Sequence, residues 1–258
     1  FAFTGNKFEF RSVASSMSIA GANTVLNTIV ADVLCEMADE LEKATDFDQA
    51  VHDLIKKTLT EHQRVIFNGN GYSDEWVAEA ERRGLPNLKS MVDAIPSLVT
   101  DKSIEMFSRL GVLTETELHS RVEINYELYS KVINIEAKTM IEMASRKYVP
   151  SVIAYVKSLA DSINAVKTAV PTADVTVQSD LLIKASSLLA AAQAALVNLQ
   201  KVDAEGNAME DGKEKAVFFK DIVFAAMNEL RAPIDELEVM VDKKFWPVPT
   251  YADLLFEV

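Results

Sequence analysis

Hydrophobic residues recur three and four positions apart along most of this chain, which is the spacing that gives a helix one apolar face. The first such stretch runs from Asn23 to Leu41, and a second follows from Asp46 to Leu59, with Asp46 in position to cap it. A loop at 68–71, Asn-Gly-Asn-Gly, precedes Ser73, which is expected to cap a third helix. The chain is therefore expected to be mainly α.

The longest helical patterns lie in the second half of the chain. Thr114 and Glu117 have the spacing of a capping box, and an apolar stripe follows that includes either Val132 or Ile133. Long helices are expected at residues 114–143, 151–170, 175–202 and 213–243. Four long helices joined by short segments predict an antiparallel bundle, and the length of the first stripe leaves an elongated coiled-coil hairpin as the alternative.

Turn-forming residues in this half set further expectations. The polar stretch 203–212 is predicted to be an exposed loop. Pro150 marks the start of the second long helix, and Pro233 predicts a kink or a restart inside the last one. The segment 246–250, Trp-Pro-Val-Pro-Thr, is expected to be extended, because each proline disfavours helix at the residue before it.

The first thirteen residues differ from the rest, because charged and aromatic side chains alternate there. Lys7, Glu9 and Arg11 alternate with Phe8 and Phe10, which predicts a strand with the three charged groups on one face. A glutamate between two cations stays ionised, so it could accept a divalent cation whose phosphate ligand the cations neutralise. A solvent-facing strand explains the same spacing. Its strand partners are expected elsewhere, since no later segment predicts a sheet.

Composition narrows the class of protein. The chain has eight glycines and seven prolines among 258 residues, which favours long helices over many short strands. A formal net charge of −13 repels phosphate backbones, so nucleic-acid binding is not expected. No segment has about 18 uninterrupted apolar residues. The nearest, Leu181 to Leu199, is interrupted by polar side chains and is predicted to be a buried helix, so no membrane span is expected.

The cysteine and the histidines show no pattern of a metal or redox site. Cys35 is the only cysteine, which excludes an internal disulfide and is compatible with a reducing cytoplasm. It is expected to be buried and unreactive on an apolar helix face. His52, His62 and His119 lack metal-ligand spacing and are expected at the surface or in caps. The chain begins with Phe1 rather than Met, so processing or a piece of a longer protein is expected.

Short blocks along the chain resemble one enzyme family. Residues 3–11, Phe-Thr-Gly-Asn-Lys-Phe-Glu-Phe-Arg, resemble the strand that closes the active site of glutamine synthetases. Residues 15–28, which begin Ser-Ser-Met-Ser-Ile-Ala-Gly-Ala-Asn, resemble the type III branch in particular. Further blocks agree in the same order, at 65–73, 117–121, 133–137 and 246–258. By this resemblance the chain is identified as the C-terminal part of a type III glutamine synthetase.

The resemblance implies an activity and a division of the chain. Glutamine synthetases phosphorylate glutamate with ATP and let ammonia displace the phosphate, with Mg²⁺ or Mn²⁺ held between carboxylates. The family forms homo-oligomers of stacked rings, and a cytoplasmic location is implied. Residues 1–15 would be a remnant strand of the catalytic domain, 16–112 its helical part, and 113–258 a C-terminal bundle of long helices.

The resemblance also implies roles for three residues. Glu9 would be a metal ligand near the ATP phosphates, Arg11 would bind glutamate or stabilise the transferring phosphoryl group, and Lys7 would contact phosphate. Phosphoryl transfer depends on such positioning and charge neutralisation. One carboxylate cannot hold Mg²⁺, so the chain alone is expected to be inactive. Without the resemblance, the pattern favours a stand-alone helical interaction or adaptor module.

Overall fold

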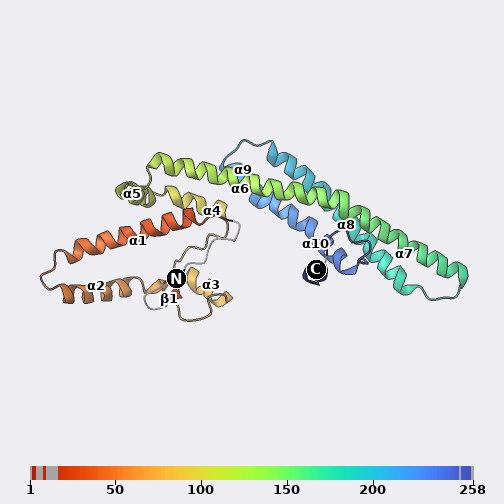
Figure 1. Cartoon of the computed structure of the whole chain (residues 1–258), viewed down its shortest axis with the longest axis horizontal. Helices are drawn as coiled ribbons and strands as arrows, with labels where there is room; N and C mark the ends of the chain where they lie inside the picture. Colours follow the sequence, from red (N-terminus) through yellow and green to blue (C-terminus); the bar gives the residue numbers. More distant parts are fainter. Residues whose placement is uncertain (1, 4–7, 10–16, 250, 257–258) are drawn as a thin grey trace. The chain divides into compact units, whose positions relative to one another are not determined.

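The computed structural model describes residues 2–3, 8–9, 17–249 and 251–256, and most of these residues are helical (Figure 1). The predicted fold class, a mainly α protein with long helices in a bundle, is confirmed. The chain forms two compact units, Phe1–Val122 and Glu123–Val258. The division into 1–15, 16–112 and 113–258 stays a prediction.

Two very short strands stand at the start of the first unit. β1 (Ala2–Phe3) pairs antiparallel with β2 (Phe8–Glu9), and Phe3 lies opposite Phe8. The predicted strand is therefore present at Phe8 and Glu9. The expectation that its partner lies elsewhere is wrong for this edge, because Phe8 and Glu9 pair with Phe3 and Ala2.

Two helices of the first unit begin where the sequence predicts caps. The Asp46 carboxylate accepts a hydrogen bond from the Gln49 N–H at 3.1 Å, and Ser73 accepts one from Trp76 at 3.4 Å. These bonds satisfy backbone donors that have no partner within the helix. The helices are α1 (Ala20–Leu41), α2 (Phe47–Glu61), α3 (Asp74–Arg82), α4 (Met91–Ala94) and α5 (Asp101–Arg109), with 3-10 turns η1 (Gln63–Val65) and η2 (Ile95–Val99).

Much of the apolar surface of α1 is uncovered. Thr28 is the one buried residue of this helix. The side chains of Ile29, Val30 and Leu34 are exposed, and so is Cys35. The prediction of a buried Cys35 is wrong, because the apolar face on which it lies stays largely exposed in the described part of the chain.

The capping box at Thr114 is confirmed and opens the longest uninterrupted helical run. The Thr114 N–H donates to the Glu117 carboxylate at 2.8 Å, and the Glu117 N–H donates to Thr114 Oγ1 at 3.3 Å. The run consists of α6 (Glu115–Met143), the π-helical segment η3 (Ala144–Tyr148) and α7 (Val149–Ala169).

The prediction of a separate helix starting near Pro150 is therefore wrong. Proline lacks an N–H, and its ring crowds the carbonyl of the fourth residue before it. Here the turn just before Pro150 is widened, and the Val149 N–H donates to the carbonyl of Ala144. The widened turn lets the helix continue through the proline. The predicted four long helices thus become three long helical runs.

Further helices complete the described part of the second unit. They are α8 (Thr176–Asn207), α9 (Lys213–Phe218), the π-helical segment η4 (Phe219–Val223), α10 (Phe224–Met240) and the short α11 (Tyr251–Phe256). Helix α8 returns along α7, and α10 lies along α8 (Figure 1). α10 continues through Pro233, so the predicted restart there does not occur. The predicted loop 203–212 is wrong for 203–207, which are helical.

The core of the second unit lies on one face of α8. Ala185, Ala192, Leu196 and Leu199 are buried there and belong to one apolar cluster with residues of α7 and α10. By length and composition, α8 is the one described helix that could cross a membrane. The sequence predicted a buried helix at Leu181 to Leu199, and this prediction is wrong for most of the segment. α8 packs through one face against α7 and α10, and only 17% of its most apolar window is buried.

Gly206 tests how tightly this core is packed. A Cβ atom at Gly206 would lie 2.9 Å from the ring of Phe219, which is fully buried. We expect Gly206→Ala to lower the free energy of unfolding by about 1–3 kcal/mol, because a core ring must move. Urea denaturation followed by circular dichroism measures this change.

Two further variants test whether contact with the Phe219 ring causes the loss of stability. Gly21→Ala in α1 meets no atom within 4 Å, so it should be neutral or stabilising by up to about 1 kcal/mol. Phe219→Leu combined with Gly206→Ala should cost less than the sum of the two single changes. Additive costs would show that the ring and the added methyl group do not meet.

Candidate functional site

The residues predicted to carry chemistry lie at the N-terminal end of the chain. Lys7 and Arg11 lie outside the described residues. Glu9 is in β2, where its backbone pairs with Ala2. Their roles stay predictions.

The described part of the chain contains no group of three or more His, Cys, Asp or Glu side chains that could hold a metal ion. His52 and His119 are exposed, and His62 follows α2 as its C-cap, which matches the surface and capping roles predicted for them. The described residues therefore do not form a complete metal site. Any metal bound through Glu9 needs further ligands from elsewhere.

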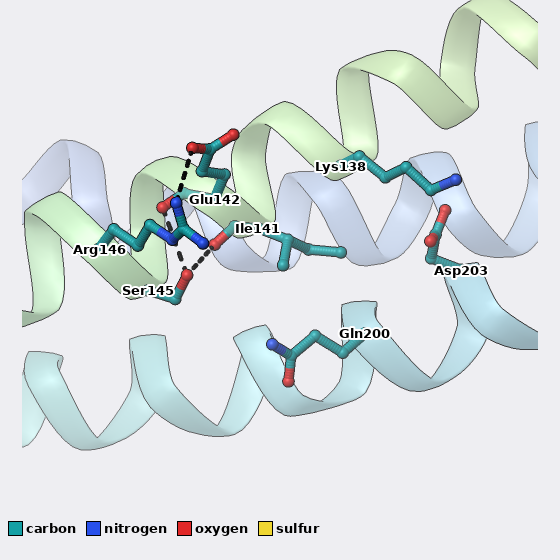
Figure 2. Close-up of a pocket in the computed structure, with 7 residues that line it drawn as sticks. All are labelled: Lys138, Ile141, Glu142, Ser145, Arg146, Gln200 and Asp203. Atoms are coloured by element: carbon teal, nitrogen blue, oxygen red, sulfur yellow. Dashed lines mark hydrogen bonds and ion pairs between the residues drawn. The ribbon is translucent and has the colours of Figure 1, made fainter.

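An open groove with a cavity volume of about 460 Å³ runs between the α6–η3 segment and α8. Figure 2 shows the residues that line it. They are Lys138, Ile141, Glu142, Ser145, Arg146, Gln200 and Asp203. Both signs of charge are present, so the groove has no strong preference for cations or anions.

Three polar side chains in this groove are engaged within their own helix. Ser145 Oγ donates to the carbonyl of Ile141 at 2.6 Å, and Arg146 lies 3.4 Å from the Glu142 carboxylate. A hydroxyl that donates to its own helix backbone is not activated as a nucleophile, because no base accepts its proton. The arrangement supports helix packing rather than a reaction.

Asp203 is the buried charged residue of the groove. It is 7% exposed, and its Oδ1 atom is buried with no hydrogen-bond partner among the described residues. Burial raises the pKa of Asp203, while the positive charge of Lys138 and a hydrogen bond from Asn207 act in the opposite direction. Figure 2 shows the Lys138 side chain extending from α6 toward Asp203 on α8.

Sequence reasoning missed Asp203 because the polar stretch 203–212 predicts a loop. A usable signal was present. Ala192, Leu196, Leu199, Asp203 and Gly206 follow one another at spacings of four and three, so the buried face of α8 continues through Asp203. Periodicity here outweighs local polarity.

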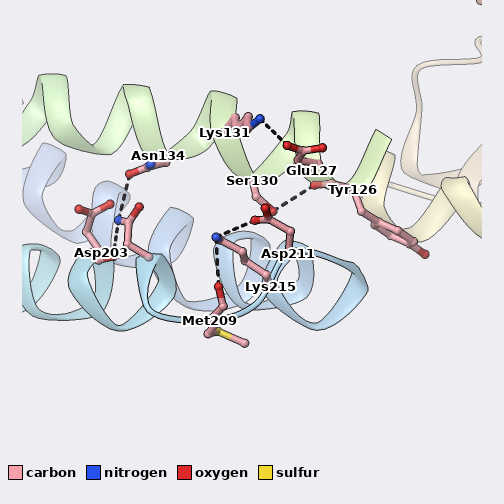
Figure 3. Close-up of polar contacts among 10 residues, drawn as sticks. Tyr126, Glu127, Ser130, Lys131, Asn134, Asp203, Met209, Asp211 and Lys215 are labelled. Atoms are coloured by element: carbon pink, nitrogen blue, oxygen red, sulfur yellow. Dashed lines mark hydrogen bonds and ion pairs between the residues drawn. The ribbon is translucent and has the colours of Figure 1, made fainter. Parts of the chain in front are cut away.

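Hydrogen bonds fasten the end of α8 and the following turn (Figure 3). Asn207 Nδ2 donates to Asn134 Oδ1 of α6 at 3.1 Å. Lys215 Nζ donates to the Asp211 carboxylate at 2.8 Å and to the carbonyl of Met209 at 3.2 Å. These contacts hold the turn 208–212 against the start of α9.

A second groove, in the first unit, has a different character. It lies between α1 and α2, has a cavity volume of about 480 Å³ and is almost entirely apolar. Its lining includes Leu34, Met37, Leu54 and Leu59, of which only Leu54 is buried. Exposed apolar surface of this kind occurs at contacts with proteins, membranes or ligands.

Comparison with known proteins gives the family. Residues 50–167 match the family model described as "Glutamine synthetase C-terminal domain". The chain is 37% identical to "Type-3 glutamine synthetase" of Dictyostelium discoideum over 266 residues, 36% identical to "Glutamine synthetase" of Butyrivibrio fibrisolvens over 267, and 30% identical to "Glutamine synthetase" of Bacteroides fragilis (strain YCH46) over 264.

These matches cover 99%, 100% and 99% of this chain, but 36%, 37% and 36% of the relatives. The chain therefore spans little more than a third of the length of the relatives that it matches. It belongs to the glutamine synthetase family and carries the C-terminal domain of that family. A stand-alone adaptor module, the alternative from the helical pattern, is not favoured.

The buried carboxyl of Asp203 yields a prediction on stability. Its raised pKa means that protonation favours the folded state, so stability falls as the pH rises from the unfolded pKa, about 3.9, through the folded value. We expect Asp203→Asn to flatten this dependence. At pH 7 this substitution should raise the midpoint of thermal unfolding by about 2–4 °C. This is the shift that a change of ~1 kcal/mol in the free energy of unfolding produces in a chain of this size.

Lys138→Met is the matched control, because it removes the compensating charge and keeps the length of the side chain. It should lower the midpoint at pH 7 and leave it unchanged at a pH where Asp203 is protonated. Thermal scans between pH 3 and 8 measure both variants. A lower midpoint for Asp203→Asn at pH 7 would show that the charge of Asp203 stabilises the fold.

Proposed function

We propose that this chain is the C-terminal third of an ATP-dependent glutamate–ammonia ligase. Such an enzyme transfers the γ-phosphoryl group of ATP to the side-chain carboxylate of glutamate, and ammonia then displaces phosphate from the γ-glutamyl phosphate. The observation that carries the proposal is the similarity to glutamine synthetases over 99–100% of the chain.

Three residues of this chain are proposed to act in that reaction. Glu9 contributes one carboxylate to a Mg²⁺ or Mn²⁺ site, Lys7 neutralises phosphate charge, and Arg11 binds glutamate or the transferring phosphoryl group. A cation beside a phosphoryl group stabilises the charge that develops during transfer. The alternating sequence supports this arrangement, because in a strand these three side chains share one face.

The proposed enzyme needs more than this chain. Mg²⁺ takes near-octahedral oxygen ligands, and Glu9 supplies one carboxylate. No described residues form a cluster that could complete the site. We therefore infer that the remaining ligands and the ATP site belong to the part of the ligase that precedes this chain, and that the chain alone is inactive.

The uncovered apolar surface of the first unit agrees with this inference. The groove between α1 and α2 and the exposed residues Ile29, Val30 and Leu34 present apolar area to solvent. Burying such surface is worth about 25 cal/mol per Å². The catalytic part of the enzyme is the proposed cover for this face. The intact ligase is proposed to be a cytoplasmic homo-oligomer.

Glu9→Ala in the full-length protein tests the proposal. We expect the rate of ATP-dependent glutamine formation to fall by at least about a hundredfold, as for the loss of one preorganised charge-stabilising group. Coupled measurement of ADP and glutamine follows the reaction. Glu36→Ala, which removes an exposed carboxylate from α1, is the control and should leave the rate unchanged.

The 258-residue chain is assayed beside the full-length protein and should show no turnover. Full activity of the Glu9→Ala variant would show that Glu9 is not a metal ligand. Absence of any ligase activity in the folded full-length protein, with both substrates and Mg²⁺ present, would refute the proposed reaction itself.

A further inference from the structure

Helix α6 carries a second apolar stripe that the fold of the second unit does not use. Ile124, Leu128, Val132 and Ile135 are exposed by 56%, 43%, 43% and 63%. They follow one another at spacings of four, four and three, so they lie on one face of the helix. The stripe is about 17 Å long at 1.5 Å per residue.

This stripe lies nearly opposite the face that α6 turns to the core. The core face consists of Tyr126, Ser130, Ile133 and Ala137, all buried. With 3.6 residues per turn, the mean directions of the two faces differ by about 175°. A helix that is apolar on one face packs once, whereas α6 is apolar on two faces, and among the described residues only one of them is covered.

We propose that the stripe packs against the same stripe of a second copy of this chain, with the two α6 helices antiparallel. A two-fold axis near the middle of the stripe then places Ile124 opposite Ile135 of the second copy, and Leu128 opposite Val132 of the second copy. The spacing is thus complementary to itself, as an isologous contact requires.

The charges beside the stripe favour the same arrangement. Glu127 and Lys131 lie on one edge of it and form an ion pair within the helix (Figure 3). In the antiparallel pair this edge faces itself, so Glu127 of each copy lies beside Lys131 of the other. Two reciprocal pairs of opposite charge result, which select this partner and this orientation.

The contact is small. One helix pair of this length falls short of the about 1,000 Å² that a stable interface buries. It therefore acts as one contact within a larger homo-oligomer and is weak by itself. The inference rests on α6 alone and does not depend on the ligase reaction, so the two can fail separately.

Cysteine pairing tests the register of the contact in the 258-residue chain. In a Cys35→Ser background, Ile124→Cys and Ile135→Cys are purified separately, then mixed under mild oxidation. A disulfide needs Cα atoms about 4.4–6.8 Å apart. We expect cross-linked dimer in the mixture and none in either variant alone, identified by mass spectrometry of the joined peptides.

Glu123→Cys mixed with Glu136→Cys is the control, because these exposed positions have the same register but lie on other faces of α6. This mixture should give no dimer. A disulfide within Ile124→Cys alone would show a parallel contact and overturn the proposal. Absence of a link in the first mixture would overturn it too.

A charge exchange gives an independent readout. Glu127→Lys places four positive charges at the contact of a homodimer, and Lys131→Glu places four negative ones. In sedimentation velocity, each variant alone should associate less than the parent chain. The association constant of their mixture should be about fivefold higher than that of either variant alone. Equal association of the separate and mixed variants would refute the reciprocal pairing.

Discussion

The close approach of α8 to α7 and α10 is the constraint on which the second unit depends. Small side chains on one face of α8, among them Ala185 and Ala192, are fully buried, and Gly206 leaves room for the ring of Phe219. Interiors are packed to the density of crystals, so the larger side chains of α10, such as Leu230 and Leu237, fit only because α8 is narrow along this face.

The two widened turns, η3 and η4, belong to the same packing. η3 lets the helix pass Pro150, and it places Tyr148 beside Trp246, with ring centroids 5.1 Å apart. η4 contains Phe219 and Val223, both fully buried in the core. A π turn adds one residue to a helical turn, which rotates the residues that follow it about the helix axis. Each π turn therefore changes the direction in which the apolar face of its helix points.

The first unit differs from the second in how much of its apolar surface is uncovered. Side-chain caps start α2 and α3, yet α1 and α2 leave apolar side chains and an open groove uncovered. A family relationship that covers little more than a third of the relatives' length agrees with a surface made for contact with further protein. Apolar side chains on both α1 and α6 stay exposed in the described part of the chain.

The sequence by itself determined the helical class, the caps at Asp46, Ser73 and Thr114, and the order of family motifs, because each depends on residues close together in the chain. Only the tertiary structure decided that Ile133 rather than Val132 is buried, that Cys35 is exposed and that Asp203 is covered. Periodicity shows that a face is apolar, but it does not show whether another surface covers that face. The passage through Pro150 was decided in the same way, since a widened turn keeps a helix continuous where packing on both sides holds it in place. The predicted site at Lys7, Glu9 and Arg11 rests on the alternation of residues and on the family resemblance. A local sequence pattern cannot identify the further metal ligands that this site needs.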